Sequence, residues 1–294
     1  MVTSLPIQGR ALTWAHDGKS RSFGDGRRIS GEYMPSQRET SADQVAAAAA
    51  RTVAAGSARL LAAWSQGSPV AGRADRRCEG IADFAARRAR VWQVPLFTDG
   101  IAADFIEQRQ ATDGDDLSPL AEPQEMVYDG ANAYVHVADN WTGFFLGDRD
   151  GPRSVNDPLW PLDALSGARD AVEIGADEVR GVAAVRYRVT VDLAQADAAL
   201  PAGVTVPGGP YRALSQIPAE VWLDSAGRAR RIAVVTERPA GDDQVPVWSI
   251  IELWDFGVPA GIVPPDPADL VSPRQAYGEA PAGPASSRPH FASE

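Results

Sequence analysis

The residue types that most often carry covalent catalysis are sparse in this sequence. Cys78 is the single cysteine, and it lies within a strand-like pattern with no recognisable activating partner. A single cysteine excludes an intramolecular disulfide and any zinc or iron-sulfur site built from several cysteines. The sequence also lacks the Gly-x-Ser-x-Gly motif of a nucleophile elbow. We therefore expect no catalytic residue and no enzymatic activity.

Metal and cofactor motifs are equally weak. The three histidines, His16, His136 and His290, are scattered along the chain and do not form a His-x-x-x-His pair that a helix could present to a metal. Acidic residues at 113, 115 and 116 alternate as in a calcium loop, but the glycine and the terminal glutamate of such a loop are missing. We expect a solvated loop there, no metal site and no cofactor.

Charge excludes one broad class of function. The chain of 294 residues has 28 basic and 39 acidic side chains, which gives a formal net charge of −11. Nucleic acids are held largely by lysine and arginine on phosphates, and no basic face is visible in the sequence. We predict that the protein does not bind nucleic acid.

Large apolar side chains remain as candidates for a binding function. Many of them fall on predicted strands or on a short predicted helix, where they could face a common concavity. An apolar gap between a curled sheet and its helices can bind an apolar ligand. The residues predicted to line such a cavity are Trp92, Tyr134, Phe144, Leu159, Leu162, Tyr187, Val189, Val191, Val221, Leu223, Ile251 and Leu253.

The elements that would position these residues are mostly strands. The run 185–193 (VRYRVTVDL) alternates strictly between apolar and polar residues, which predicts a strand with one buried face. Similar runs at 58–66, 76–84, 88–96, 125–128, 131–137, 141–146, 217–224, 228–236 and 248–256 predict further antiparallel strands. A meander of that size must curl.

Two helices are expected beside the strands. Ser41 and Gln44 form a capping-box pattern ahead of an alanine-rich run that ends at Gly56. The run 157–165 (DPLWPLDAL) predicts a short helix that starts at an Asp cap with Pro in its first turn. We predict a mainly β, α+β fold: an antiparallel half-barrel of about nine or ten strands whose helices cover the concave face.

The domain organisation follows from these patterns. Residues 1–40 are polar and without period, which predicts a loosely ordered arm. Residues 41–272 hold the predicted half-barrel. Prolines accumulate after 257, and residues 273–294 are predicted to be a disordered tail.

Several of these segments resemble the LppX/LprG group of lipoproteins, which have the LolA/LolB-like fold. The segments are 179–194 (VRGVAAVRYRVTVDLA), 217–235 (IPAEVWLDSAGRARRIAVV) and 251–271 (IELWDFGVPAGIVPPDPADLV), together with "YDG" at 128–130 and "DPL" at 157–159. The resemblance covers about residues 41–272. It implies an apolar cavity that carries the acyl chains of a lipid or lipoprotein.

Two functions stay open on the sequence alone. The first is a non-enzymatic carrier of lipid or acyl chains, as the resemblance implies. The second is a soluble interaction or sensor domain with a filled core, which would contact a protein partner through its acidic surface or its proline-rich tail.

The cellular location is open in the same way. The sequence as printed shows no signal peptide, no lipobox cysteine and no apolar run long enough for a transmembrane helix, which predicts a cytoplasmic protein. The resemblance implies the cell envelope instead.

Overall fold

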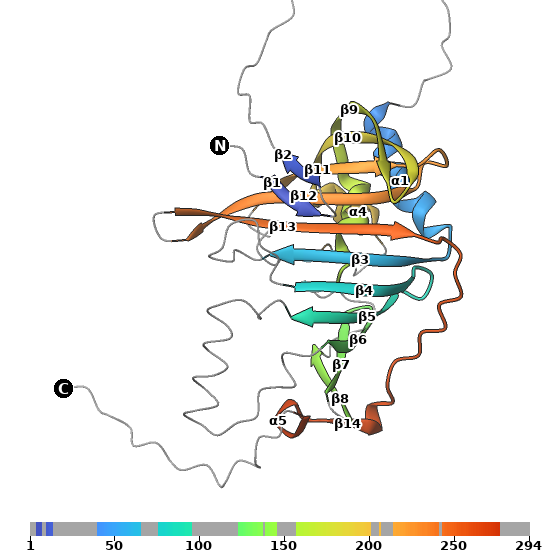
Figure 1. The fold of residues 1–294 in the computed structure, drawn as a ribbon, viewed down its shortest axis with the longest axis vertical. Coiled ribbons are helices and arrows are strands. Elements are labelled where there is room, and N and C mark those ends of the chain that lie inside the picture. Colours follow the sequence, from blue (N-terminus) through green and yellow to red (C-terminus); the bar gives the residue numbers. More distant parts are fainter. Residues whose placement is uncertain are drawn as a thin grey trace, which may run out of the picture.

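The computed structural model contains one large sheet that is built from two consecutive meanders (Figure 1). It describes residues 4–7, 10–13, 40–65, 76–95, 123–137, 139–145, 157–200, 206, 214–240 and 243–276. The sheet has twelve strands in the order β14-β8-β7-β6-β5-β4-β3-β13-β12-β11-β10-β9. Every neighbouring pair is antiparallel except β14 with β8, which is parallel.

Along the chain, the first meander runs from the middle of the sheet outward, and the second runs from the opposite edge back to the middle. The first comprises β3 (Ser57–Ser65), β4 (Arg76–Asp83), β5 (Arg88–Pro95), β6 (Gln124–Asp129), β7 (Asn132–Val137) and β8 (Asn140–Phe145). The second comprises β9 (Ala168–Val179), β10 (Val182–Asp192), β11 (Gln216–Leu223), β12 (Ala229–Ala240) and β13 (Asp243–Trp254). The two meet where β13 pairs with β3, with Ser249 opposite Trp64. Strands β1 (Ser4–Ile7) and β2 (Arg10–Thr13) form a separate two-stranded sheet.

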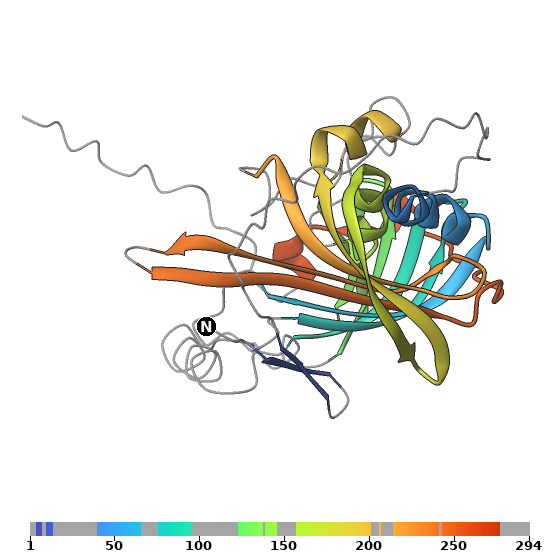
Figure 2. The same ribbon diagram turned by 90° about the horizontal axis from the view of Figure 1, so that it is seen from above.

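The curled sheet partly encloses the helices α1 (Ser41–Val53), α3 (Trp160–Ala164) and α4 (Leu193–Ala199) (Figure 2). The 3-10 turn η2 (Leu165–Gly167) follows α3 directly in the chain. Helix α1 begins one residue earlier than the capping-box prediction placed it. Thr40 is the N-cap, and its side chain accepts a hydrogen bond from the backbone N–H of Asp43, whose carboxylate accepts one from Thr40 in return. Ser41 and Gln44 are therefore helical residues and not the capping pair.

The concave face is filled by one large apolar cluster. The alternation predicted for the strand at 185–193 is confirmed, because Tyr187, Val189 and Val191 are buried in this cluster while Arg188 is exposed. Strands of both meanders contribute to the cluster in the same way, with residues such as Leu60 and Val221 pointing inward. Burial of this apolar surface, at about 25 cal/mol per Å², is the main force holding helices and sheet together.

The opposite face carries buried charge. Glu220 on β11 and Glu252 on β13 are almost fully buried there. Glu220 pairs with Arg186, and Glu252 pairs with Arg231 and Arg180. Buried carboxylates are stable only when paired and hydrogen-bonded, so these arginines hold the outer surfaces of β10 to β13 together.

A C-terminal strap follows β13 across the outer side of the first meander. Residues 255–272 lead to the 3-10 turn η4 (Pro267–Asp269) and to β14 (Leu270–Val271), and α5 (Pro273–Ala276) comes next. Ile262 of this strap packs with Val127 and Tyr134 in a small separate cluster. The strap therefore covers part of the outer face of β6 and β7.

The fold class predicted from the sequence is confirmed, and the large sheet has twelve strands where about nine or ten were expected. The prediction missed β9, β14 and α4, and it assigned no strand to residues 1–40, where β1 and β2 lie. The short helix is shorter than predicted, and the predicted Asp cap is wrong. Helix α3 begins at Trp160, and its N-cap residue is Leu159, which makes no side-chain cap hydrogen bond. Asp157 accepts a hydrogen bond from the Leu159 N–H at 2.8 Å in the preceding turn. The acidic loop and the tail beyond 276 lie outside the described residues. Within the described part of the chain, no helix has the length and apolar character needed to cross a membrane.

Candidate ligand-binding site

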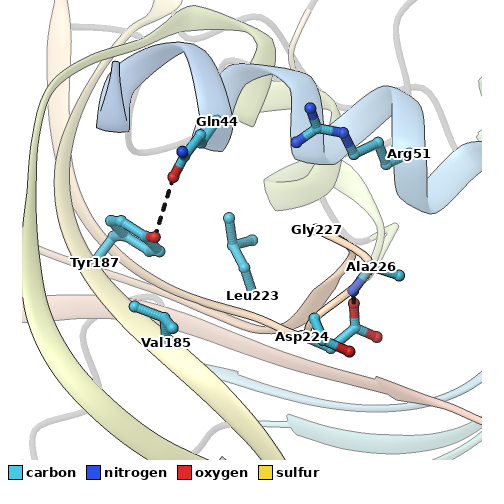
Figure 3. Close-up of a pocket in the computed structure, with 9 residues that line it drawn as sticks. Gln44, Arg51, Val185, Tyr187, Leu223, Asp224, Ala226 and Gly227 are labelled. Atoms are coloured by element: carbon cyan, nitrogen blue, oxygen red, sulfur yellow. Dashed lines mark hydrogen bonds between the residues drawn. The ribbon is translucent and has the colours of Figure 1, made fainter. Parts of the chain in front are cut away.

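A pocket of about 410 Å³ lies between α1 and the β10, β11 region of the sheet. Gln44 and Arg51 reach it from the helix, while Val185 and Tyr187 on β10 and Leu223 at the end of β11 face them (Figure 3). The turn between β11 and β12, from Asp224 to Gly227, forms the remaining wall. The lining thus combines apolar side chains with an arginine, an amide, a phenol and a carboxylate.

Helix α1 is fixed over the sheet by a buried threonine. The Thr52 hydroxyl donates to the Ala48 carbonyl at 2.7 Å and accepts from the backbone N–H of Ala229 at 2.9 Å. Arg51 is the adjacent residue, so the same contact fixes its position relative to the β11 to β12 turn. This contact links the helical wall of the pocket to the sheet wall.

The β11 to β12 turn is built around Asp224. Its carboxylate accepts hydrogen bonds from the backbone N–H groups of Ala226 and Arg228 and from the side chains of Arg228 and Arg230. Burial raises the pKa of Asp224, but these hydrogen bonds outweigh it, and the net pKa is lowered below the ordinary value. Asp224 is therefore a charged structural group at neutral pH and a poor proton donor.

Gly227 allows Arg51 to approach the turn closely. Its φ is +72°, a left-handed conformation that side-chain residues rarely adopt. A Cβ at this position would lie 2.9 Å from Nη1 of Arg51. The guanidinium therefore lies against the turn at a place where a side chain on residue 227 would force it to move.

The other end of the pocket is closed by a hydrogen bond between sheet and helix. The Tyr187 hydroxyl donates to Oε1 of Gln44 at 3.2 Å. Burial raises the pKa of Tyr187, and the negative charge of Glu173, its register partner on β9, raises it further. Tyr187 is thus a neutral donor at physiological pH, and its ring belongs to the apolar core behind the pocket.

The structure brings nine of the twelve predicted cavity residues into one apolar cluster on the concave side. They are Leu159, Leu162, Tyr187, Val189, Val191, Val221, Leu223, Ile251 and Leu253. Tyr187 and Leu223 also line the pocket. The other seven lie in the cluster and are not among the residues that line this pocket.

Two predicted residues lie elsewhere, which corrects the prediction for them. Trp92 is 49% exposed, because it alternates with the inward Val91 and so points to the outer face. Tyr134 is buried, but on the outer face beneath the strap, where it contacts Val127 and Ile262. The side chain of Phe144 lies outside the described part of the structure.

Sequence reasoning missed most of the polar pocket lining. Gln44, Arg51 and the residues from Asp224 to Gly227 line the pocket but were not among the predicted site residues. Gln44 and Arg51 are seven positions apart and so lie on one helix face, a spacing that could have suggested a shared role. Which turn that face meets depends on the packing of α1 and could not be read from the helix alone.

The described residues offer no obvious nucleophile or metal centre. Cys78 is buried in the main core, and burial raises the pKa of its thiol far above the ordinary value. Among the described residues, no group of three His, Cys, Asp or Glu side chains is placed to hold a metal ion.

Comparisons with known proteins return matches by structure alone. No family model matches the sequence, and neither does any curated protein. The chain is similar in structure to the Mycobacterium tuberculosis lipoprotein LppX, with 12% identity, a TM-score of 0.42 and coverage of 74% of this chain and 98% of that one. LprF from Mycobacterium bovis matches with 13% identity, a TM-score of 0.45 and coverage of 77% and 96%.

A putative outer membrane lipoprotein-sorting protein domain from Vibrio parahaemolyticus also matches, with 6% identity and a TM-score of 0.23 over 73% of this chain and 90% of that one. The search thus returns lipoproteins of the kind that the sequence resembles. Likenesses at this level carry no conclusion about the ligand or the partners of this chain.

Proposed function

We propose that the protein is a non-enzymatic binding protein that holds an apolar chain, such as the acyl chain of a lipid. The observation that carries the proposal is that part of the pocket wall belongs to the apolar core. Tyr187 and Leu223 line the pocket and are also members of the core cluster. An apolar chain bound beneath α1 would contact these two side chains.

Size and energetics are consistent with such a ligand. A volume of about 410 Å³ lies within the range of small-molecule sites, roughly 300–1,000 Å³. Each methylene buried there would contribute about 0.8 kcal/mol. Ten methylenes would contribute on the order of 8 kcal/mol, from which the cost of association is subtracted.

The test is binding of oleate to the delipidated protein, measured by native mass spectrometry and by titration calorimetry. Val185 is half-buried in the pocket wall, so V185W should fill the entrance and weaken oleate binding more than tenfold. Val172 on β9 is 60% exposed and does not line the pocket, so V172W is the matched control and should bind as the unmodified protein does. The absence of saturable binding to the unmodified protein would refute the proposal.

One observation favours the second function, a protein-interaction or sensor domain with a filled core. Val189, Val191, Val221 and Ile251 are at most 2% exposed, so the protein's own atoms surround them. If no lipid binds, the protein-interaction or sensor function is better supported than the carrier function. A partner captured by the full chain should then be lost when residues 273–294 are removed, and unchanged capture would argue against a role for the tail.

We also propose the cell envelope as the location, on the ground of the sequence resemblance to envelope lipoproteins. Fractionation of cells that express the native gene tests this directly. Recovery of the protein in the cytoplasmic fraction alone would contradict it.

A further inference from the structure

We infer that the outer face of the first meander carries a binding site for a neutral carbohydrate chain. The site is a row of four side chains across β5 to β8, the aromatic row: Trp92, Glu125, His136 and Trp141. It lies on the opposite face of the sheet from the pocket beneath α1, so the inference does not depend on the proposed lipid binding.

Strand pairing places the four side chains of the aromatic row in line. Trp92 on β5 is opposite Glu125 on β6. Glu125 is in turn opposite His136 on β7, and His136 is opposite Trp141 on β8. The adjacent residues along these strands, such as Val135, are buried on the concave side, so the row faces outward. Neighbouring strands lie about 4.8 Å apart, so the two tryptophans are roughly 14 Å apart across β6 and β7 (Figure 1).

Both tryptophans are partly open to solvent and are held by their neighbours. Trp92 is 49% exposed, and the Arg90 guanidinium carbon lies 5.7 Å from its ring centre. Trp141 is half-buried against the small cluster that contains Ile262, and the centre of the His136 ring lies 4.9 Å from that of its indole. Aromatic rings that are already ordered lose little conformational entropy on binding, which suits them to a ligand that stacks on them.

The polar groups between the tryptophans determine the class of ligand. Arg90 forms an ion pair with Glu125, so the row offers N–H donors and carboxylate acceptors side by side without net charge. Sugar hydroxyls both donate and accept hydrogen bonds, and the C–H faces of sugar rings stack on indole rings. A neutral oligosaccharide therefore matches both the polar and the aromatic groups of the row.

Other partners match the aromatic row less well. The hydrocarbon of a membrane would leave Arg90, Glu125 and His136 without hydrogen-bond partners outside the protein, which costs free energy. A nucleic acid or another polyanion would be repelled by Glu125 and by a protein whose net charge is −11. A peptide that adds a strand needs a free sheet edge, whereas the row lies on a face and the edge of β8 is paired with β14.

The experiment titrates the full chain with four neutral oligosaccharides of one length: cellohexaose, maltohexaose, mannohexaose and chitohexaose. Binding is measured by calorimetry and by tryptophan fluorescence, and at least one of them should bind saturably with a Kd below about 1 mM. W92A should weaken that binding at least tenfold, whereas W92F keeps an aromatic ring and should retain part of it. E125Q keeps the shape of the side chain but removes its charge and one acceptor oxygen, so it should also weaken binding.

The control is V172A. Val172 is 60% exposed on β9, at the opposite edge of the sheet, so V172A should bind the oligosaccharide as the unmodified protein does. Circular dichroism checks that each variant is folded, and E125Q decides if W92A is not. Oleate binding should be equal in W92A and in the unmodified protein, so a failure of oleate to bind refutes the proposed function alone.

Two outcomes would overturn the inference. The first is that no oligosaccharide binds saturably, or that W92A leaves the binding intact. The second is that the protein binds phosphatidylcholine vesicles and loses this binding in W92A, because the aromatic row would then be a site for a lipid surface.

Discussion

Asp224 organises the wall of the pocket through one carboxylate that accepts four hydrogen bonds. Its two arginine partners also stack on Phe256, with guanidinium to ring-centre distances of 4.4 and 4.8 Å. The turn is therefore held by charge on one side and by an aromatic ring on the other. A turn that lines a binding site needs its residues to be held in place by such packing and hydrogen bonds.

Substitution of this carboxylate should destabilise the protein in a pH-dependent way. D224N removes the charge and one of the two acceptor oxygens, so the free energy of unfolding should fall by about 1.5–3 kcal/mol at pH 7. The folded-state pKa is lowered, so the stability due to the charge is fully present above the unfolded pKa of about 3.9 and is lost as pH falls through the folded pKa. Urea denaturation between pH 7 and pH 3 should show the difference between the two proteins shrinking below about pH 4.

The control for this substitution is D266N. Asp266 is an exposed aspartate that accepts a hydrogen bond from the Ala268 N–H, so its replacement should change the unfolding free energy by less than about 0.5 kcal/mol. A D224N effect that is small, or that does not vary with pH, would contradict the assigned role.

Single residues of the core were predictable, whereas those of the pocket rim were not. Alternation along one strand is enough to assign Tyr187, Val189 and Val191 to one face, because the side-chain period is two. Trp92 shows the limit of this reasoning: an aromatic side chain favours burial, but its register neighbours fix it on the outer face. The rim depends on which helix residue meets which turn, and that is a tertiary contact.

Among the elements, the backbone of β5 leaves no room for a side chain at Gly80 of β4. A Cβ added to Gly80 would lie 2.0 Å from the Arg90 carbonyl oxygen and 2.7 Å from Cα of Val91. Both are backbone atoms of the neighbouring strand, so neither can rotate away. Strands β4 and β5 are neighbours in the first meander (Figure 1).

G80A should therefore force the two strands apart. We expect the free energy of unfolding to fall by about 3 kcal/mol, the upper part of the range for overpacking. Glu79 precedes it on the same strand and is exposed, so E79A should have an effect below about 0.5 kcal/mol. Chemical denaturation of both variants measures the difference, and similar midpoints for the two would show that the strands adjust freely.

Strands β9 and β14 were missed for different physical reasons. Strand β9 has exposed residues on both faces, including Val172 at 60% and Ile174 at 45%, because it is the edge of the sheet and two irregularities interrupt its register with β10. A strand without a continuous buried face shows little alternation. Strand β14 has two residues, which is too short for any period.

At the scale of the whole molecule, the strap after β13 joins the end of the chain to the first meander. Ile262 is 5% exposed and packs on Val127 and Tyr134, while the adjacent Val263 is 77% exposed. The pair offers a direct comparison of a buried anchor with an exposed neighbour in one segment.

I262A should loosen the strap. We expect the protein to lose about 2–5 kcal/mol of stability, the usual range for such a truncation in a core, and the amides of β8 and β14 to exchange faster with deuterium. V263A should leave both quantities unchanged. Equal effects of the two substitutions would mean that the strap does not depend on this contact.

The central pairing of the sheet has a consequence for synthesis of the protein. Strand β3 (57–65) pairs with β4 on one side, but its other partner is β13 (243–254), so the two meanders join only after nearly the whole chain exists. During translation, one edge of β3 has no sheet partner while about 180 further residues are made. Edges of this kind recruit strands of other chains, so the nascent protein depends on rapid completion or on chaperones.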